Sequence, residues 1–311
     1  MSEQKRIAVA GAGAIGMLYS GLLARVAPGQ VTLLTRRADA KTRLAEGVTV
    51  IDADGKALVG KPDIMTYEEA LSRAQRFDVV IVAVAAYDNA AVGALIAQVL
   101  APEGLCITVQ NGLDNRAALA PALGAQRVLQ GSTSFAVHQS DDGHVHINGP
   151  GVTSLQALPK AQSWLEPLLA QAGLAPGRID DPELLAWTKI AGGSIGILCI
   201  ILAAPAGKLS TLKSVANVAD QALVETVRIA RACGVALDLE QMRARQQASW
   251  SRLDENTRAS LYSSFVAGRR TELDDRLGGL LRRAHEKGVA TPVLGCLYEL
   301  AQARLELAGI R

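Results

Sequence analysis

Residues 6–16 read Arg-Ile-Ala-Val-Ala-Gly-Ala-Gly-Ala-Ile-Gly, an apolar run that opens directly into a G-x-G-x-x-G pattern. The run is short enough for a β-strand, and residues 15–23 continue as an apolar stretch compatible with a helix. In such a strand–turn–helix unit the first glycine makes the tight turn, the second lets the backbone approach a pyrophosphate, and the third lets the helix pack closely on the strand. The phosphates would then lie on free N–H groups at the helix N-terminus. The stretch predicts a dinucleotide site, with a glycine-rich turn in an ordinary α/β protein as the alternative. Its candidate cofactor-binding residues are Gly11, Ala12, Gly13, Ala14, Ile15 and Gly16.

Length and composition limit the class of protein. The chain has 311 residues, which suggests about two domains, and 49% of them are hydrophobic, which is ample for a core. Its net charge is +2 with no long basic block, and this argues against nucleic acid or a membrane as the main partner. Four cysteines lie far apart without C-x-x-C spacing, so we expect buried free thiols in a reducing cytosol. The N-terminus leaves no room for a signal peptide, and we therefore expect a cytoplasmic protein.

The pattern of apolar residues divides the chain in two. Strand-like and helix-like segments alternate as far as residue 177, whereas long helical patterns follow it. This order predicts an α/β fold in which a Rossmann-type dinucleotide-binding domain, residues 1–177, precedes an all-helical substrate and catalytic domain, residues 178–311. The apolar stretch 190–206 is interrupted by glycines and Pro205, so it is typical of a buried helix rather than a membrane span. The expected helices after the boundary are residues 182–202, 212–233, 239–251, 260–288 with internal breaks, and 292–307.

Strands of the first domain can also be assigned. Asp54-Gly55, between apolar residues 48–51 and 57–59, is typical of a hairpin turn. Residues 148–151, Asn-Gly-Pro-Gly, join two strand-like segments, 145–147 and 153–157, which we expect to form an antiparallel pair. The other expected strands are residues 30–35, 77–86, 104–110 and 128–137.

The end of the second expected strand carries Thr35-Arg36-Arg37. NAD-specific folds usually have Asp or Glu here, about twenty residues past the glycines, to hold the ribose 2′-hydroxyl. A carboxylate would repel a 2′-phosphate, whereas a guanidinium binds it through charge-assisted hydrogen bonds. Arg36 therefore predicts NADP(H) as the cofactor, and whether Arg37 shares the phosphate stays open. The alternative is a solvated pair of surface arginines.

Five motifs are spread along most of the chain: Gly-Ala-Gly-Ala-Ile-Gly at 11–16, Arg36, Gln-Asn-Gly at 110–112, Trp-Thr-Lys at 187–189 and Thr-Glu-Leu-Asp at 271–274. Together they resemble the motifs of the ketopantoate reductases (2-dehydropantoate 2-reductases). The resemblance implies a Rossmann domain joined to a helical domain, an active site in the cleft between them, and NADPH-dependent reduction of a small-molecule 2-oxo acid. For the family's own substrate the reaction converts ketopantoate to pantoate, in pantothenate biosynthesis. We also expect a homodimer through the apolar surface of the helical domain.

The resemblance also assigns roles to residues. It implies that Lys189 is the general acid, which donates a proton to the carbonyl oxygen as hydride arrives and stabilises the developing alkoxide. Glu272 matches an acidic residue near the cofactor and the reaction centre, and Asn111 matches an asparagine near both nicotinamide and substrate. Ser260 falls where family members have a serine that contacts the substrate carboxylate. By themselves, Lys189 and Glu272 would be read as surface residues, and Asn111 as a turn residue before Gly112.

Three positions depart from the family pattern. Family members have asparagines four and eight residues after the lysine, on one helix face, where they hold polar groups of the substrate. Gly193 and Ile197 stand at these substrate-binding positions and cannot donate a side-chain hydrogen bond, while Ser194 is about 100° round the helix. Ala85 stands where many members have a lysine that helps to hold the cofactor or substrate. Because an unmet buried polar group costs about 1–3 kcal/mol, we expect a substrate that is bulkier or less hydroxylated than ketopantoate.

Other interpretations stay open. The chain could act as an NADP-linked dehydrogenase on a related hydroxy acid or an imine, or it could be a non-catalytic NADP-binding protein that has lost its substrate site. His138, His144 and His146 cluster around Asp141-Asp142, and a metal site is conceivable there. No additional ligand pattern supports it, so we expect a polar hairpin and no metal.

Overall fold

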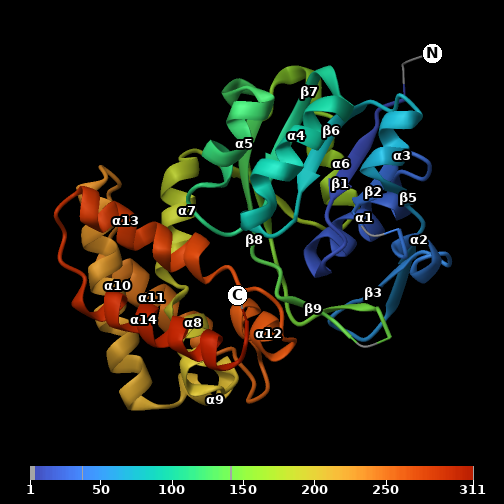
Figure 1. The fold of residues 1–311 in the computed structure, drawn as a ribbon. Coiled ribbons are helices and arrows are strands. Elements are labelled where there is room, and N and C mark those ends of the chain that lie inside the picture. Colours follow the sequence, from blue (N-terminus) through green and yellow to red (C-terminus); the bar gives the residue numbers. More distant parts are fainter. Residues whose placement is uncertain (1–3, 37, 141, 311) are drawn as a thin grey trace. The chain divides into compact units, whose positions relative to one another are not determined.

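The computed structural model describes residues 4–36, 38–140 and 142–310, so Arg37 lies outside the described residues. It divides into two compact units, which are coloured along the chain in Figure 1. Unit 1 comprises the described residues up to Gln110 together with Asn115–Pro182, and unit 2 comprises Asn111–Asp114 together with the described residues from Glu183 onward. The short segment Asn111–Asp114 therefore belongs with the helical unit, although in sequence it is enclosed by the first.

A large mixed sheet is the framework of unit 1. Among the described residues it has eight strands in the order β12-β11-β8-β7-β6-β1-β2-β5. The strands from β8 to β5 run parallel, whereas β11 pairs antiparallel with β8 and parallel with β12. Their bounds are β1 (Ile7–Ala10), β2 (Val31–Thr35), β5 (Asp63–Thr66), β6 (Phe77–Val82), β7 (Leu100–Thr108), β8 (Val128–Thr133), β11 (Thr153–Gln156) and β12 (Pro176–Ile179).

Helices cover both faces of this sheet, because alternate residues of a strand point to opposite sides. Ile7 and Val9 of β1 lie in a buried cluster with residues of α1 (Ala14–Val26) and α6 (Leu165–Gln171). Ala8 and Ala10 lie in another cluster with residues of α4 (Asn89–Val99) and α5 (Asn115–Leu123). The predicted α/β class with a Rossmann-type parallel sheet is thus confirmed. Further helical segments are α2 (Ala40–Arg43), α3 (Tyr67–Ser72), η1 (Ala86–Asp88), η2 (Ala125–Arg127) and η3 (Lys160–Gln162).

A smaller sheet in unit 1 corrects two predictions. It contains β3 (Val48–Ile51), β4 (Ala57–Gly60), β9 (Val137–Gln139) and β10 (Val145–Ile147). The hairpin at Asp54-Gly55 is confirmed, since β3 and β4 pair antiparallel. The predicted pairing of 145–147 with 153–157 is wrong, because β10 pairs with β9 and β3 while β11 joins the large sheet. The predicted strand 128–137 is likewise divided between the sheets as β8 and β9. Residues 148–151 cross between the sheets, where a Cβ on Gly151 would lie 2.4 Å from the ring of Phe135.

The sequence analysis does not predict the edge strands β5 and β12. Asp63 begins β5 and Pro176-Gly177 begins β12, and these residue types are depleted in strands. Pairing with β2 and β11 stabilises both segments in spite of their composition. Strand β12 spans residues 177 and 178, at which the sequence analysis divides the chain, and unit 1 continues to Pro182.

Unit 2 consists of helices and the loops that join them. The predicted helix 182–202 is broken at Gly192-Gly193. The stretch 260–288 is divided as expected, with a break near Gly268, which has a φ of 63°. Glycine destabilises a helix interior, which accounts for both breaks, and it readily adopts the positive φ found at Gly268. The helical segments are α7 (Pro182–Ala191), α8 (Ser194–Leu202), α9 (Ala206–Ser210), α10 (Lys213–Ala232), α11 (Leu239–Trp250), α12 (Ser260–Val266), η4 (Asp274–Gly278), α13 (Gly279–Glu286) and α14 (Pro292–Leu307).

The stretch Pro182–Leu202 is long and apolar enough, by length and composition, to cross a membrane. However, 44% of its most apolar window is buried inside the structure. Trp187, Cys199 and Ile200 lie in the hydrophobic core of unit 2. A helix that is apolar on all sides is as typical of a protein core as of a membrane span, and this packing favours the core.

A buried carboxylate fixes the start of α14. Glu225 on α10 is only 5% exposed and accepts hydrogen bonds from the backbone N–H groups of Val293, at 3.0 Å, and Leu294, at 2.8 Å. N–H groups in the first turn of a helix have no partner inside the helix, and the helix dipole favours an anion there. Glu225 therefore connects α10 to α14 and sets the position of Leu294.

We expect Glu225→Ala to lower the free energy of unfolding by about 3 kcal/mol, because two buried N–H groups lose a charged acceptor. Urea denaturation followed by circular dichroism measures this change. The matched control is Glu299→Ala on the exposed side of α14, which should change the free energy of unfolding by less than about 0.5 kcal/mol. A loss below about 1 kcal/mol for Glu225→Ala would contradict the capping role.

Candidate active site

The turn between β1 and α1 has the geometry that its glycines predict. Gly11 has a φ of 114°, which favours glycine. A Cβ on Gly16 would lie 1.8 Å from the carbonyl oxygen of Gly11, so α1 packs against the turn only because residue 16 has no side chain. A Cβ on Gly13 would meet no described atom within 4 Å, so the space beside this residue is open.

This turn fits a dinucleotide pyrophosphate. Helix α1 begins at Ala14 with Gly13 as its capping residue, and glycine has no side chain to cap the N–H groups of the first turn. Uncapped N–H groups at a helix N-terminus, together with the helix dipole, bind phosphate. Ala12, Ala14 and Ile15 would contribute through their backbone.

Arg36 directly follows the last residue of β2 and makes an ion pair that the sequence analysis missed. Its side chain is 57% exposed, and Nη2 donates to Oδ2 of Asp88 at 2.6 Å. Asp88 ends η1, which follows β6, so the ion pair joins the carboxyl ends of two strands that flank β1. Ligands of open α/β sheets bind at this edge. The sequence signal that could have predicted this ion pair is Asp88, an acidic residue shortly after the expected strand 77–86.

A side-chain amide holds the loop that carries Ala85. This alanine precedes η1 and offers no polar side chain where family members have a lysine. Gln110 is 7% exposed, and its Nε2 donates to the carbonyl oxygen of Val84 at 2.8 Å and to Oδ1 of Asn89 at 2.7 Å. In the Gln-Asn-Gly motif, the glutamine therefore has a structural role in unit 1.

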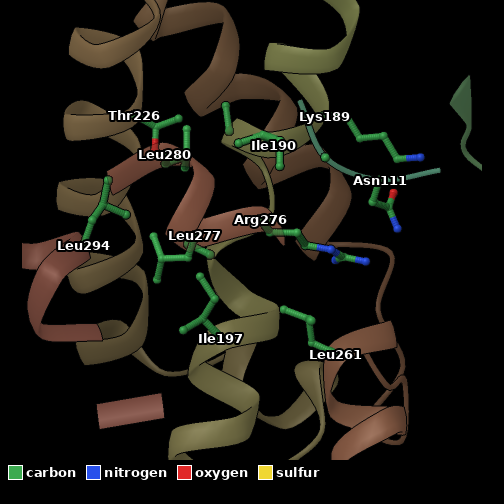
Figure 2. A pocket seen from close by; sticks show the side chains of 14 residues that line it. Asn111, Lys189, Ile190, Ile197, Thr226, Leu261, Arg276, Leu277, Leu280 and Leu294 are labelled. Atoms are coloured by element: carbon green, nitrogen blue, oxygen red, sulfur yellow. The ribbon is translucent and has the colours of Figure 1, made fainter. Parts of the chain in front are cut away.

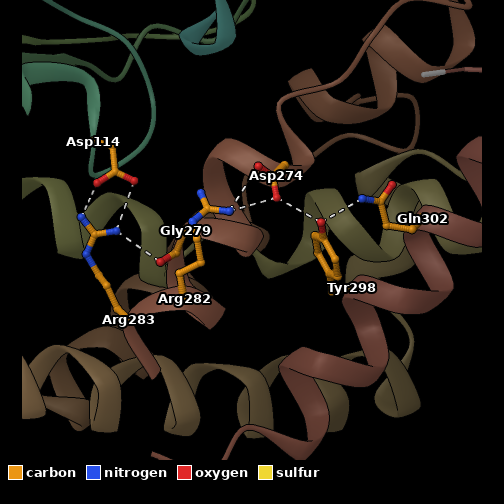
Figure 3. A network of polar contacts seen from close by, with 7 residues as sticks. All are labelled: Asp114, Asp274, Gly279, Arg282, Arg283, Tyr298 and Gln302. Atoms are coloured by element: carbon orange, nitrogen blue, oxygen red, sulfur yellow. Dashed lines mark hydrogen bonds and ion pairs between the residues drawn. The ribbon is translucent and has the colours of Figure 1, made fainter. Parts of the chain in front are cut away.

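An ion pair ties the segment Asn111–Asp114 to the helices of unit 2. Asp114 accepts hydrogen bonds from Arg283 of α13, whose Nη1 also donates to the carbonyl oxygen of Gly279 at 3.2 Å (Figure 3). The Arg283 side chain is 25% exposed, so water screens this pair less than a pair on the open surface. The ion pair holds Asn111 within unit 2.

A cavity within unit 2 collects several of the predicted substrate residues (Figure 2). Asn111, Lys189, Gly193 and Ile197 line it. Lys189 lies on α7 and Ile197 on α8, and both line the cavity although the helix predicted to carry them is broken between them. The other lining residues are Gly112, Ile190, Ala191, Ser194, Thr226, Leu261, Arg276, Leu277, Leu280 and Leu294.

The cavity has a polar end and an aliphatic end. In Figure 2 the nitrogen-bearing ends of Lys189, Asn111 and Arg276 point to the same side, away from Leu294 and Thr226. Thr226 adds little polarity, because its hydroxyl donates to the carbonyl oxygen of the residue four positions earlier, at 2.8 Å. Such a cavity suits a small molecule with a charged head and an apolar body.

Lys189 is the titratable group at the polar end. Burial lowers its pKa to about 8, because the surroundings disfavour the ammonium form. The charge of Arg276 also lowers this pKa, whereas Glu272 raises it. At neutral pH the amine is mostly protonated yet close to its pKa, the condition under which a general acid is most effective.

Ser194 also lines the cavity. On an unbroken helix its side chain would point about 100° away from the direction of residue 193. The turn at Gly192-Gly193 changes the phase between α7 and α8, so residue 194 no longer points where a continuous helix would direct it. Its hydroxyl is buried and has no hydrogen-bond partner among the described residues. One hydroxyl group therefore stands near the position where family members have two amides.

The sequence analysis missed Arg276, the residue through which Glu272 and Ser260 approach the cavity. Arg276 lies in the π-helical segment η4. Its Nη2 donates to Oε2 of Glu272 at 2.7 Å and to Oγ of Ser260 at 3.1 Å. Glu272 and Ser260 are not lining residues themselves. The four-residue spacing from Glu272 could have predicted the ion pair, but not the wider π-helical turn.

The histidines of the smaller sheet were the other candidates for a site. His138 and His146 stack across the β9–β10 pair with ring centroids 5.0 Å apart. Within the described ranges, no three His, Cys, Asp or Glu side chains are grouped to hold a metal ion. Cys296 is exposed, which corrects the expectation that all thiols are buried.

Comparison with protein families gives two matches that together cover most of the chain. Residues 7–160 match the model described as "Ketopantoate reductase PanE/ApbA", and residues 182–305 match "Ketopantoate reductase PanE/ApbA C terminal". The chain is similar to the 2-dehydropantoate 2-reductase of Halobacterium salinarum, with 30% identity over 96% of this chain and 98% of that protein. It is also similar to the enzyme of the same name from Caulobacter vibrioides, with 25% identity over 96% and 98% of the two chains.

Solved structures share the fold. The ternary structure of D-mandelate dehydrogenase with NADH and anilino(oxo)acetate has a TM-score of 0.89 at 22% identity, and covers 98% of this chain and 100% of that one. A PanE/ApbA family ketopantoate reductase from Ralstonia eutropha has a TM-score of 0.85 at 24% identity, with coverage of 98% and 99%. The two family matches and the full-length relatives lead to one conclusion: this chain belongs to the ketopantoate reductase family.

Proposed function

We propose that this protein is an NADPH-dependent reductase that converts a 2-oxo acid into a 2-hydroxy acid. The observation that carries the proposal is Lys189, a partly buried lysine with a pKa of about 8 at the polar end of a largely aliphatic cavity. Full-length relatives named 2-dehydropantoate 2-reductase support the same reaction class. Glycine geometry that fits a pyrophosphate supports a nicotinamide dinucleotide as the redox partner.

The residues of the cavity have separate tasks in this reaction. When bound, NADPH supplies the hydride that reduces the keto carbon. Lys189 Nζ donates a hydrogen bond to the keto oxygen, stabilises the negative charge that develops on it and transfers a proton to it. Asn111 orients the carbonyl group through its side-chain amide. Glu272 pairs with Arg276 and favours the charged form of Lys189, so it maintains the proton donor.

The proposal predicts opposite pH dependences for the two directions of reaction. Reduction needs protonated Lys189, so kcat/KM for the 2-oxo acid should be level below pH 8 and fall about tenfold per pH unit above it. Oxidation of the 2-hydroxy acid needs the neutral amine, so its kcat/KM should fall as the pH decreases through the same value. Steady-state kinetics from pH 6 to 10 measures both profiles.

Two variants serve as controls for the pH profiles. Lys189→Arg keeps the charge but does not titrate in this range, so the fall above pH 8 should disappear from its residual activity. Lys189→Met should lower kcat about a thousandfold and change the Kd for NADPH less than threefold. Unchanged turnover of Lys189→Met would remove Lys189 from the mechanism.

We further propose NADPH rather than NADH as the preferred cofactor. The residue that directly follows β2 is Arg36, a cation, and not the carboxylate that is usual in NAD-specific folds. Asp88 accepts a hydrogen bond from Arg36, so a 2′-phosphate has to share or displace this contact. Arg36→Gln should raise the Kd for NADPH ten- to a hundredfold and change the Kd for NADH less than threefold, as measured by nucleotide fluorescence. In the matched variant Asp88→Asn the affinity for NADPH should rise. Tighter binding of NADH than of NADPH by the unmodified protein would refute the assignment.

The substrate class follows from the aliphatic end of the cavity. Gly193 and Ile197 offer no amide to the 4-hydroxyl group of ketopantoate, and Ser194 is a single hydroxyl in this region. We propose a 2-oxo acid with a branched apolar side chain. A cytoplasmic location and a homodimer stay predictions for this chain.

Two 2-oxo acids that differ only by the hydroxyl group test this substrate class. We expect kcat/KM for 3,3-dimethyl-2-oxobutanoate to exceed that for ketopantoate, its 4-hydroxy derivative, at least tenfold, because an unpaired buried hydroxyl costs about 1–3 kcal/mol. NADPH absorbance gives both values on one enzyme preparation. A preference for ketopantoate, with kcat/KM near about 10⁵ M⁻¹s⁻¹ or above, would contradict the altered substrate.

A further inference from the structure

The cavity holds a second cation besides the proton donor. Arg276 lines the cavity with a side chain that is 15% exposed. Lys189 and Arg276 are the charged residues among the described residues that line the cavity, and neither is a carboxylate. A cavity with two cations in its wall is suited to an anion, because buried charges are stable only when they are paired.

The hydrogen bonds of Arg276 leave donors unused. Both hydrogen bonds that its side chain donates to described residues come from Nη2, one to Glu272 and one to Ser260. Its Nε is buried and has no hydrogen-bond partner among the described residues. A guanidinium has five N–H donors in a fixed planar fork, and a buried donor without an acceptor is unfavourable. Arg276 is therefore positioned on one side and able to bind an acceptor on another.

The π-helical segment explains why Arg276 reaches the cavity. Its backbone N–H still donates to the carbonyl oxygen of Glu272 at 3.1 Å, but residues 274–278 form the wider turn of a π-helix. Such segments change the direction of side chains within a helix and frequently occur at functional sites. Leu277, the next residue, lines the cavity as well.

We propose that Arg276 binds the carboxylate of the substrate, while Glu272 and Ser260 position its guanidinium. This inference rests on the proposed reduction of a 2-oxo acid. In such a substrate the carboxylate is bonded directly to the keto carbon, so the keto oxygen and the carboxylate lie at the same end of the molecule. Two cations at the polar end of the cavity can therefore bind one group each. Lys189 takes the keto oxygen and Arg276 the carboxylate. Ser260, which the family resemblance places on the carboxylate, contacts Arg276 in this chain.

A purely structural role for Arg276 makes a different prediction. As half of a helical ion pair with Glu272, four residues away, Arg276 would stabilise the fold slightly and would not distinguish charged from neutral substrates. The carboxylate role requires that loss of the guanidinium affects only substrates that carry a negative charge. The two roles can therefore be separated by the charge of the substrate.

The test compares 3,3-dimethyl-2-oxobutanoate with its uncharged primary amide, in the presence of saturating NADPH. The unmodified enzyme should prefer the acid at least a hundredfold in kcat/KM. In Arg276→Gln, kcat/KM for the acid should fall at least a hundredfold, mainly through KM, while that for the amide changes less than threefold. Arg276→Lys should show an intermediate loss, because it keeps the charge but not the planar fork.

Arg282→Gln is the matched control. Arg282 pairs with Asp274 at 3.2 Å on the exposed surface and does not line the cavity (Figure 3). Its loss should leave the preference for the acid unchanged. The Kd for NADPH and the midpoint of thermal unfolding, measured for every variant, show whether each protein is folded; if Arg276→Gln does not fold, Arg276→Lys decides.

Two results would overturn the inference, and they differ. If the unmodified enzyme reduces the acid and folded Arg276→Gln or Arg276→Lys keeps the full preference for the acid, Arg276 does not bind the carboxylate, and the proposed function is unaffected. If the unmodified enzyme reduces no 2-oxo acid with NADPH, the proposed function fails and this inference fails with it.

Discussion

Lys189 carries a charge beside a largely aliphatic cavity. The free-energy cost of desolvating this ammonium group is the constraint to which the arrangement of polar groups around the cavity relates. Desolvation lowers its pKa to about 8, so the ammonium is held without being strongly favoured. The polar groups that stabilise this charge lie at one end of the cavity only. The Asp114–Arg283 ion pair holds the segment with Asn111, and Arg276 carries Glu272 and Ser260 to the same end. The other end stays aliphatic, where the carboxylate of Glu225 fixes Leu294 through the start of its helix. This separation leaves Lys189 with a pKa near neutral pH, which suits the proton-donor role that we propose for it.

The glycine turn of unit 1 and the cavity of unit 2 are constrained in different ways. The glycine turn at 11–16 is constrained by backbone contacts, because a side chain on Gly16 would overlap the carbonyl oxygen of Gly11. The cavity is lined by side chains from several helices, so its chemistry depends on which residues stand there. Gly193 and Ile197 change what the wall can hydrogen-bond, and Arg276 adds a charge to it. The chain thus combines a turn that fits a dinucleotide with a cavity that we propose to be the substrate site.

The sequence predicts most where structure is determined locally. The strand and turn at 7–16, the hairpin at Asp54-Gly55 and the helix at 292–307 all depend on neighbouring residues, and each is present. The pairing of 145–147 fails because strands far apart in sequence compete for it, and β3 and β9 are its partners. Lys189, Gly193 and Ile197 all line the cavity, although the single helix predicted to bring them together is broken. Arg276 and Asp88 were missed because their roles depend on a π-helical turn and on a contact between separate strands. Ser194 was considered but placed away from Gly193 and Ile197, because the local pattern does not show the helix break.

The central claim is that the polar end of this cavity binds the two oxygen-bearing groups of a 2-oxo acid with two different cations. A crystal structure of the protein with NADP⁺ and 3,3-dimethyl-2-oxobutanoate tests it directly, because the oxidised cofactor cannot reduce the acid. We expect the keto oxygen within hydrogen-bond distance of Lys189 Nζ, the carboxylate on the guanidinium of Arg276, and the dimethyl group towards Ile197 and Leu294. A carboxylate bound away from Arg276, with Lys189 distant from the keto oxygen, would contradict the account.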